Sequence, residues 1–286
     1  MRTLRAAGLF VLASVLIMAA AGPLGADVKA ELGFGWSLHA PAISTSYLNQ
    51  FVPPMTPAAN YVNSSASQTV RLNGKIGTGM AGFFNILIND RIGVQLLVDY
   101  FRPNVGGSNS DFDILLNYTT TGARQYTRSD SWPDSKGNFT ETTYSLNGLV
   151  RFPLSSDISF SLSGGPTAFY LKGEATPMGY CSFRLEQDVD VYTLYIKTFQ
   201  LVYDFGPKTT FGGNLGGEIA YTIMRTVILA LDVRYFLSAR DDFQMHITPN
   251  EGLTEDAQTI EEALNLGSIR IDPSYFRVGL TLRFRF

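Results

Sequence analysis

The sequence predicts an all-β protein, namely a closed antiparallel transmembrane β-barrel of eight strands. Apolar and polar residues alternate at period two in repeated runs of about 8–11 residues, the length of a strand that crosses a membrane at a tilt. Aromatic residues make up 13% of the chain, with 20 Phe and 14 Tyr. The connections between these runs alternate between short and long, as they do when a barrel has short turns on one side of the membrane.

The first 26 residues have the pattern of a cleaved export signal. Arg2 and Arg5 precede an apolar run from Leu9 to Ala21, and small residues follow as far as Ala26. This is the order of the three regions of a secretory signal peptide. The apolar run is about 13 residues long, whereas a spanning helix needs ~20. We expect cleavage after Ala26, with cleavage after Ala21 as the alternative and a retained anchor as the less favoured one.

Residues 27–286 are then expected to form one barrel domain. Loss of residues 1–26 lowers Lys plus Arg from 22 to 20 against 25 acids, which is a net charge of about −5. This mild acidity argues against a nucleic-acid partner, which needs a basic face. Cys181 is the only cysteine, so no internal disulfide can support the fold.

Eight runs alternate in this way. Apolar residues on one face of each run oppose Gly, Ser, Thr, Asn or charged residues on the other. The predicted strands, in order, are Val28–Leu38, Val70–Met80, Arg91–Tyr100, Thr143–Phe152, Ile158–Ser163, Phe211–Ile223, Val227–Tyr235 and Tyr275–Phe286.

A soluble β-sandwich would also alternate, so the period alone does not decide between the two classes. Aromatic residues lie near the run ends, as in the interfacial girdles of membrane barrels. The polar faces carry charges that a dry sandwich core would not accept unpaired. Short connections are predicted at 88–90, 153–157 and 223–225, and long ones at 39–69, 102–140, 172–208 and 238–271. Together these features favour the barrel.

The inward faces carry a predicted network of charges. Its expected members are Glu31, Arg71, Lys75, Asp99, Arg151, Glu218, Asp232, Arg234, Arg277 and Arg283, with Lys29 and Arg285 near the ends. Eight bases against four acids give an expected interior charge of about +4. An eight-stranded barrel is just wide enough for its side chains to fill it, so we expect paired charges that close the bore. A narrow path that prefers anions is the alternative.

The chain resembles the small outer-membrane barrels of the OmpA, OmpX and OmpW type over nearly all of residues 27–286. The final run resembles the C-terminal strand that the barrel assembly machinery recognises in such proteins. That resemblance assigns the assembly signal to Tyr275, Leu280, Leu282, Phe284 and Phe286. It also implies a bacterial outer-membrane location, contact with lipid or lipopolysaccharide, and a monomer.

The long connections have their own patterns. Residues 189–205 are apolar enough to extend the hairpin between strands five and six, with an extra strand pair, giving ten strands, as the alternative. Residues 254–266 place apolar side chains at helical spacing and predict a short surface helix. Residues 103–140 show turn signals and no period, so we expect an irregular loop there.

Candidate catalytic and binding motifs are weak. Gly77 to Gly82 has the spacing of a dinucleotide loop but no helix follows it, so these glycines are better explained as relief of crowding in a curved strand. His39 and His246 lack the His-x-Ser arrangement of barrel deacylases. Asp111, Asp113 and the acids of 251–262 lack metal-ligand spacing. We therefore expect no cofactor and no metal.

Three functions remain in order of preference. The first is a non-enzymatic barrel that acts through its exposed loops. The second is a porin-like channel for small or hydrophobic solutes, which the OmpW resemblance implies. The third is a lipid A-modifying enzyme.

Overall fold

The computed structural model describes residues 27–248 and 257–286, and most of them lie in β-strands. The predicted signal segment 1–26 and residues 254–256 of the predicted helix lie outside the described residues. No helix in the described ranges is both long and apolar enough to cross a membrane. The predicted all-β class is confirmed.

Eight strands form a closed ring in which each strand pairs antiparallel with both neighbours. Around the ring the order is β1, β5, β6, β10, β11, β12, β13 and β16, and β16 pairs back with β1. The bounds are β1 Val28–Pro41, β5 Gly77–Ile88, β6 Ile92–Phe101, β10 Ser135–Pro153, β11 Ile158–Asp188, β12 Val191–Met224, β13 Val227–Ser238 and β16 Tyr275–Arg285. Closure leaves the ring without a free strand edge.

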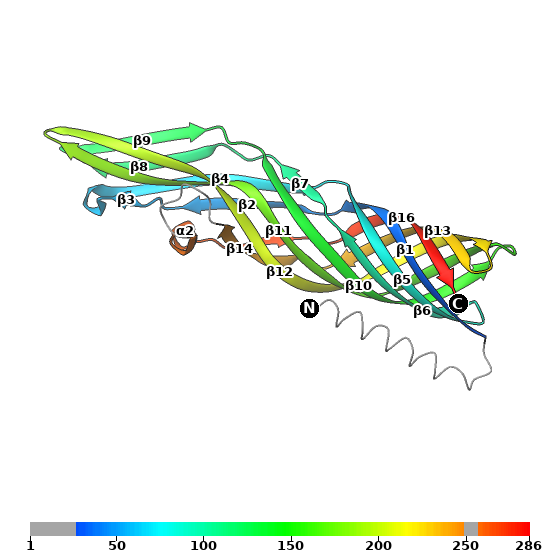
Figure 1. The fold of residues 1–286 in the computed structure, drawn as a ribbon. Helices are drawn as coiled ribbons and strands as arrows, with labels where there is room; N and C mark the ends of the chain where they lie inside the picture. The colour runs from blue at the N-terminus through cyan, green and yellow to red at the C-terminus, as the bar shows by residue number, and fades with distance from the viewer. Residues whose placement is uncertain (1–26, 249–256) are drawn as a thin grey trace.

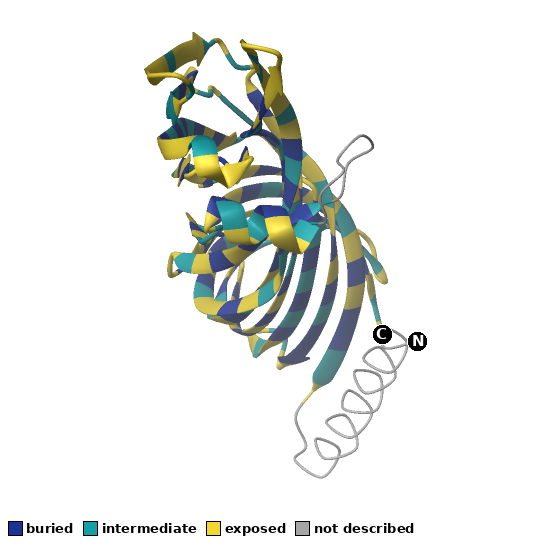
Figure 2. Ribbon diagram, turned by 90° about the vertical axis from the view of Figure 1, so that its left-hand side faces the viewer, coloured by how far each residue is buried: buried dark blue, intermediate teal, exposed yellow. Residues whose placement is uncertain are grey.

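Buried and exposed residues alternate along the ring strands (Figure 2). On β1, Glu31 and Ser37 are buried, whereas Phe34 and Trp36 are 62% and 55% exposed. Consecutive side chains of a strand point to opposite faces, so polar residues line the inside and apolar residues the outside. We call the outward apolar residues of the eight strands the apolar belt. The face assignments made from sequence agree with the structure on seven of the eight runs, the exception being Val70–Met80.

The predicted second strand at 70–80 is wrong. The alternating run crosses a break between β4, which ends at Gly74, and β5, which begins at Gly77. Leu72 is buried before the break, but Met80 is exposed after it, so residues of the same parity change from the inner to the outer face. Alternation reports the period of a strand and not where the strand ends. Arg71 and Lys75 are consequently exposed and lie outside the ring interior.

Short turns join the strands at one end of the ring, which we call the near end and which also holds Phe286. The turn between β5 and β6 places Asn89 and Asp90 at φ of 52° and 59°. Positive φ at both central residues is the requirement of a tight type I′ hairpin, and Asn and Asp tolerate it. The predicted short connections at 88–90, 153–157 and 223–225 all lie at this end.

At the far end the chain continues into a second folded region, which we call the outer extension (Figure 1). It contains the outer parts of β10, β11 and β12 together with the strands inserted between the ring strands. These are β2 Ser44–Phe51, β3 Met55–Thr56, β4 Tyr61–Gly74, β7 Asn104–Gly107, β8 Phe112–Thr119, β9 Ala123–Asp130, β14 Asp241–Thr248 and β15 Ser268–Ile271, with the 3-10 turn η2 Ala58–Asn60 and helix α2 Ala257–Leu264.

The outer extension has its own apolar core. Leu72, Phe112, Phe139, Leu171 and Phe205 are among its fully buried members, and they come from five different strands. The predicted long loops are therefore folded structure. The hairpin extension predicted at 189–205 is present, because β11 and β12 stay paired out to Asp188 and Val191.

The predicted helix is also present in part, as α2, and it buries Ile260 and Leu264. The irregular loop predicted at 103–140 is wrong. Phe112, Ile114 and Leu116 alternate as buried residues of β8, which pairs with β9. The alternating run of β8 is only 8 residues long and is surrounded by Ser, Thr and Gly, so the turn signals obscured it in the sequence.

Candidate functional site: a filled interior beneath a folded extension

At the near end of the ring, the interior is organised around the carboxylate of Glu31. Arg151 donates to both carboxylate oxygens, at 2.8 and 2.7 Å, and Arg285 donates to one of them at 2.8 Å. Asn85 donates a further hydrogen bond at 3.1 Å. Paired, charge-assisted bonds of this kind are the strong class, and they satisfy both oxygens of this fully buried carboxylate.

A second ion pair lies beside the first. Arg283 donates two hydrogen bonds to Glu218, one of them at 2.6 Å, and both residues are buried. The guanidinium of Arg283 also lies 4.9 Å from the ring centre of Phe83, and that of Arg277 lies 5.1 Å from the same ring. An aromatic face attracts cations, so Phe83 stabilises two arginines of like charge.

In the middle of the ring Arg234 joins side chains from three directions. Its guanidinium donates to Asn214 at 2.5 Å, to Ser163 at 2.6 Å and to Gln95 at 3.2 Å. It also pairs with Asp232 at 3.1 Å, and Arg277 reaches the same carboxylate at 3.2 Å. The bonds to Ser163 on β11 and Gln95 on β6 reach strands that do not pair with β13, so they cross the bore and help to fill it.

Aromatic rings cover the interior at the far end. His39 lies 2.8 Å from Asp99 and stacks on Phe101 at a centroid distance of 4.2 Å. Tyr275 donates to Asp99 at 2.9 Å and stacks on Phe236 at 4.3 Å. All five residues are essentially buried. The polar interior is thus closed toward the outer extension by packed rings.

The charge of the interior differs from the expected value of about +4. The buried bases are Arg151, Arg234, Arg277 and Arg283, and the buried acids are Glu31, Asp99, Glu141, Glu218 and Asp232. Arg71 and Lys75 do not belong to this group, and Lys29 and Arg285 lie near the ring's edge. Four bases against five acids leave an almost balanced interior.

Glu141 is a buried residue that the sequence reasoning missed. Neither of its carboxylate oxygens has a hydrogen-bond partner in the described part of the chain. It lies two residues before Thr143 on β10 and so shares the inward parity of that strand. The alternation along β10 could have identified Glu141 as an inward residue, but the predicted strand began at Thr143 and excluded it.

The geometry bears on catalysis and on metal binding. His39 and Asp99 form a His–carboxylate pair of the kind that activates nucleophiles, but both are fully buried, so no substrate can reach them without unfolding the far end. His246 lies in the outer extension, 3.7 Å from Glu261. Within the described ranges, no three His, Cys, Asp or Glu residues are placed to hold a metal ion.

Comparison with known proteins finds similarity only at the level of structure. No family model matches the chain, and no curated protein matches it. Solved structures that are similar include the outer membrane protein OprG from Pseudomonas aeruginosa, with 9% identity, 91% of this chain and 97% of that chain covered, and a TM-score of 0.44.

Ail, the attachment invasion locus protein of Yersinia pestis, has 8% identity, 91% and 99% coverage and a TM-score of 0.36. The outer membrane protease OmpT from Escherichia coli has 9% identity, 91% and 96% coverage and a TM-score of 0.36. OprG and OmpT are outer-membrane proteins. With TM-scores below 0.5, they do not assign a function to this chain.

Proposed function

We propose that this protein is an eight-stranded outer-membrane β-barrel with a filled interior, which anchors the outer extension at the bacterial surface as a binding module. In this proposal residues 1–26 are the cleaved export signal, the mature protein is a monomer, and it is not an enzyme. The strand Tyr275–Arg285, with Phe286 after it, is presented to the barrel assembly machinery.

The observation that carries this proposal is that the ring has apolar side chains on its outside and charged side chains inside it, the reverse of a soluble protein. Leu215, Ile219 and Leu280, on β12 and β16, are 70%, 54% and 52% exposed, and comparable apolar side chains emerge from the other ring strands. Inside the same ring lie buried arginines and carboxylates. A soluble protein does not expose a continuous apolar belt around a charged interior, because water would favour the opposite arrangement. A bilayer favours this one.

The filled interior supports an anchor over a channel. Arg234, Arg277 and Arg283 are at most 1% exposed, and the bonds of Arg234 to Gln95 and of Arg283 to Glu218 join strands that are not neighbours in the ring. The aromatic rings of Phe101, Phe236 and Tyr275 cover the far end. A conducting path would require these contacts to open.

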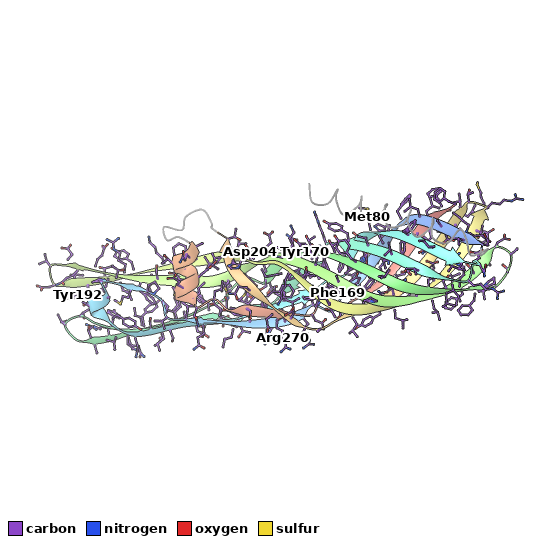
Figure 3. The ribbon with its side chains drawn as sticks, turned by 90° about the horizontal axis from the view of Figure 1, so that it is seen from below. Met80, Phe169, Tyr170, Tyr192, Asp204 and Arg270 are labelled. Carbon is purple, nitrogen blue, oxygen red and sulfur yellow. The ribbon has the colours of Figure 1, made fainter. Side chains whose placement is uncertain are left out.

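The outer extension is the part best suited to a binding role. Figure 3 shows Met80 on the ring, Phe169 and Tyr170 where the ring meets the extension, and Tyr192 near the distal tip. A groove of about 640 Å³ near this tip is lined by Thr56, Arg184, Tyr195, Lys197 and neighbouring residues. Exposed aromatic and charged side chains beside a cavity are typical of recognition surfaces.

Two measurements on refolded protein test this function. Electrophoresis with and without boiling should give different mobilities, because a folded barrel binds less detergent than its unfolded chain. Identical bands would exclude the barrel. In planar bilayers the protein should give no stable conductance steps. Steps whose ion selectivity changes in Glu218→Gln or Asp232→Asn would establish the channel instead.

The enzymatic alternative has its own test. Mass spectrometry of lipid A from cells with and without the protein should show the same acylation pattern. A change in acylation that follows expression of the protein would replace the binding role with a lipid-modifying one.

A further inference from the structure

We propose that the outward rim of the ring, where β6 ends and β10 and β11 continue into the outer extension, binds the phosphorylated headgroup of a glycolipid in the surrounding leaflet. The site, which we call the rim site, comprises Lys75, Arg102, Lys136 and Lys172 with Asn104 and Asn138. This inference rests on the membrane insertion proposed above and adds a ligand that the filled interior and the distal groove do not involve.

The rim site lies at the upper boundary of the apolar belt. On the outward face Thr142 of β10 pairs with Tyr100 of β6 on one side and with Tyr170 of β11 on the other. Tyrosines with an apolar body and a polar tip are preferred at the membrane–water interface. The next outward residue of each outer strand beyond these tyrosines is a cation, Arg102 or Lys172.

The register brings these two cations to one level. Glu141 pairs with both Phe101 and Leu171, so the residues that follow, Arg102 and Lys172, flank Thr140 on the two sides. They stand two strand spacings apart, which is roughly 10 Å. A phosphorylated sugar headgroup is wide enough to contact both.

A cavity with both polar and apolar walls continues the site above this level. Asn138 pairs with Asn104 and with Glu174, and Lys136 pairs with Gly106 and with Thr176. A cavity of about 460 Å³ is lined by Asn104, Lys136, Asn138, Glu174, Thr176 and neighbouring residues. The amine of Lys75 lies against Gly106, next to Lys136. Amide donors beside amines suit the hydroxyls and phosphate of a sugar.

The cations of the rim site are unpaired, and that distinguishes them from the rest of the rim. Within the described residues none of Lys75, Arg102, Lys136 and Lys172 has a carboxylate within 4.0 Å, and Glu174 is the one acid that lines the cavity. Elsewhere on the rim Lys208 pairs with Asp241 at 2.6 Å and Arg240 with Asp272 at 3.5 Å. The positive charge is therefore concentrated on one side.

Arg102 is also pre-oriented. Its Nε donates to the hydroxyl of Tyr100 at 2.5 Å, and the guanidinium lies 5.6 Å from the centre of that ring. Arg102 is exposed, and its two terminal nitrogens can donate to a phosphate in the bidentate geometry that arginine favours. The interfacial tyrosine thus aims a cation at the depth where lipid phosphates lie.

The experiment compares lipid binding by two variants of the refolded full chain. The binding is measured by native mass spectrometry from detergent micelles, with bisphosphorylated lipid A as the probe. Arg102→Gln/Lys172→Gln should bind with about thirtyfold lower affinity, because each of the two cations contributes a factor of about five at an anionic lipid surface. Lys208→Gln, at the same level but paired with Asp241, should bind like the unsubstituted protein. Arg102→Lys/Lys172→Arg, which keeps both charges, should retain most of the binding.

The outcomes separate this inference from the proposed function. Equal binding by the double Gln variant and by Lys208→Gln, with heat-dependent mobility intact, overturns the rim site and leaves the barrel standing. Displacement of lipid A by inorganic phosphate at similar concentration overturns the assignment to a lipid. Loss of the mobility shift in the unsubstituted protein overturns the proposed function itself.

Discussion

The ring and the outer extension share the strands β10, β11 and β12 but have opposite interiors. Along β11 the inward residues of the ring are Ser161, Ser163 and Thr167, whereas beyond the rim they become Leu171 and Ala175. Along β12 they change from Glu218 and Asn214 to Phe205 and Tyr203. The backbone pairing continues without interruption apart from two register shifts.

This difference indicates that the solvent around a strand, and not its pairing within a hairpin, decides which side chains it buries. Water around the outer extension favours apolar side chains inside it. In the proposed function lipid surrounds the ring and removes that driving force, because lipid tails are as apolar as a core. The ring interior must then be stabilised by hydrogen bonds and ion pairs.

The sharpest test of this contrast compares the same substitution, Phe to Ala, at two positions of β12. Phe205 is fully buried against Phe139, with ring centroids 4.6 Å apart, and Phe211 is 74% exposed on the apolar belt. Phe205→Ala should destabilise the outer extension by about 3–5 kcal/mol, because it leaves a cavity. Phe211→Ala leaves none and should cost far less.

The two tryptophans allow the regions to be followed separately. Trp36 lies on the apolar belt, and Trp132 packs on Phe112 in the outer extension. Denaturant unfolding in micelles of a Trp36→Phe background should show the loss for Phe205→Ala in the Trp132 emission. Equal effects of the two alanine variants would contradict the division into two environments.

Removal of one partner of a buried ion pair should be nearly as damaging to the ring. Glu218→Gln removes the carboxylate bonded to Arg283 and leaves only its longer pair with Glu31 at 3.9 Å, which should cost about 3 kcal/mol. Glu218→Leu/Arg283→Met should recover much of this loss, since it removes both charges together. Trp36 emission in a Trp132→Phe background reports the result, and a double variant less stable than the single one would contradict it.

A charge placed on the outer surface distinguishes lipid from water. Ile219 and Tyr195 are similarly exposed, at 54% and 48%, but Ile219 lies on the apolar belt and Tyr195 near the distal tip. Ile219→Arg should cost about 2–4 kcal/mol in bilayers, because an arginine near the midplane must leave water. Tyr195→Arg should have almost no effect on unfolding. Similar small effects for both would indicate that the belt does not face lipid.

The smallest expected effect is on the rate of thiol labelling and not on the free energy of unfolding. Burial raises the pKa of the Cys181 thiol to about 12 from an ordinary value of 9.0, so its thiolate is about a thousandfold scarcer below pH 9. Native protein should therefore react slowly with maleimide and should react readily once the outer extension unfolds. Cys181→Ser/Thr193→Cys moves the thiol to an exposed position and should react at once. Fast labelling of native Cys181 would show that this core is open.

The sequence by itself determined the parity of the ring. Period-two alternation placed Glu31, Asp99, Glu218 and Asp232 inside and Phe34, Leu280 and Phe284 outside, because a strand has only two faces. It also located the short turns, where Asn89 and Asp90 are residues that suit positive φ.

Only the tertiary structure decided where along the chain the buried residues change from one alternating set to the other. Arg71 and Lys75 belong to a run that alternates well, but the run leaves one strand and enters another at the rim. Alternation is local, whereas the environment on each side of a strand is set by the strands that pair across long separations. For the same reason the folded core of the outer extension, the unpaired Glu141 and the one-sided cations of the rim site emerged only once the strands were paired.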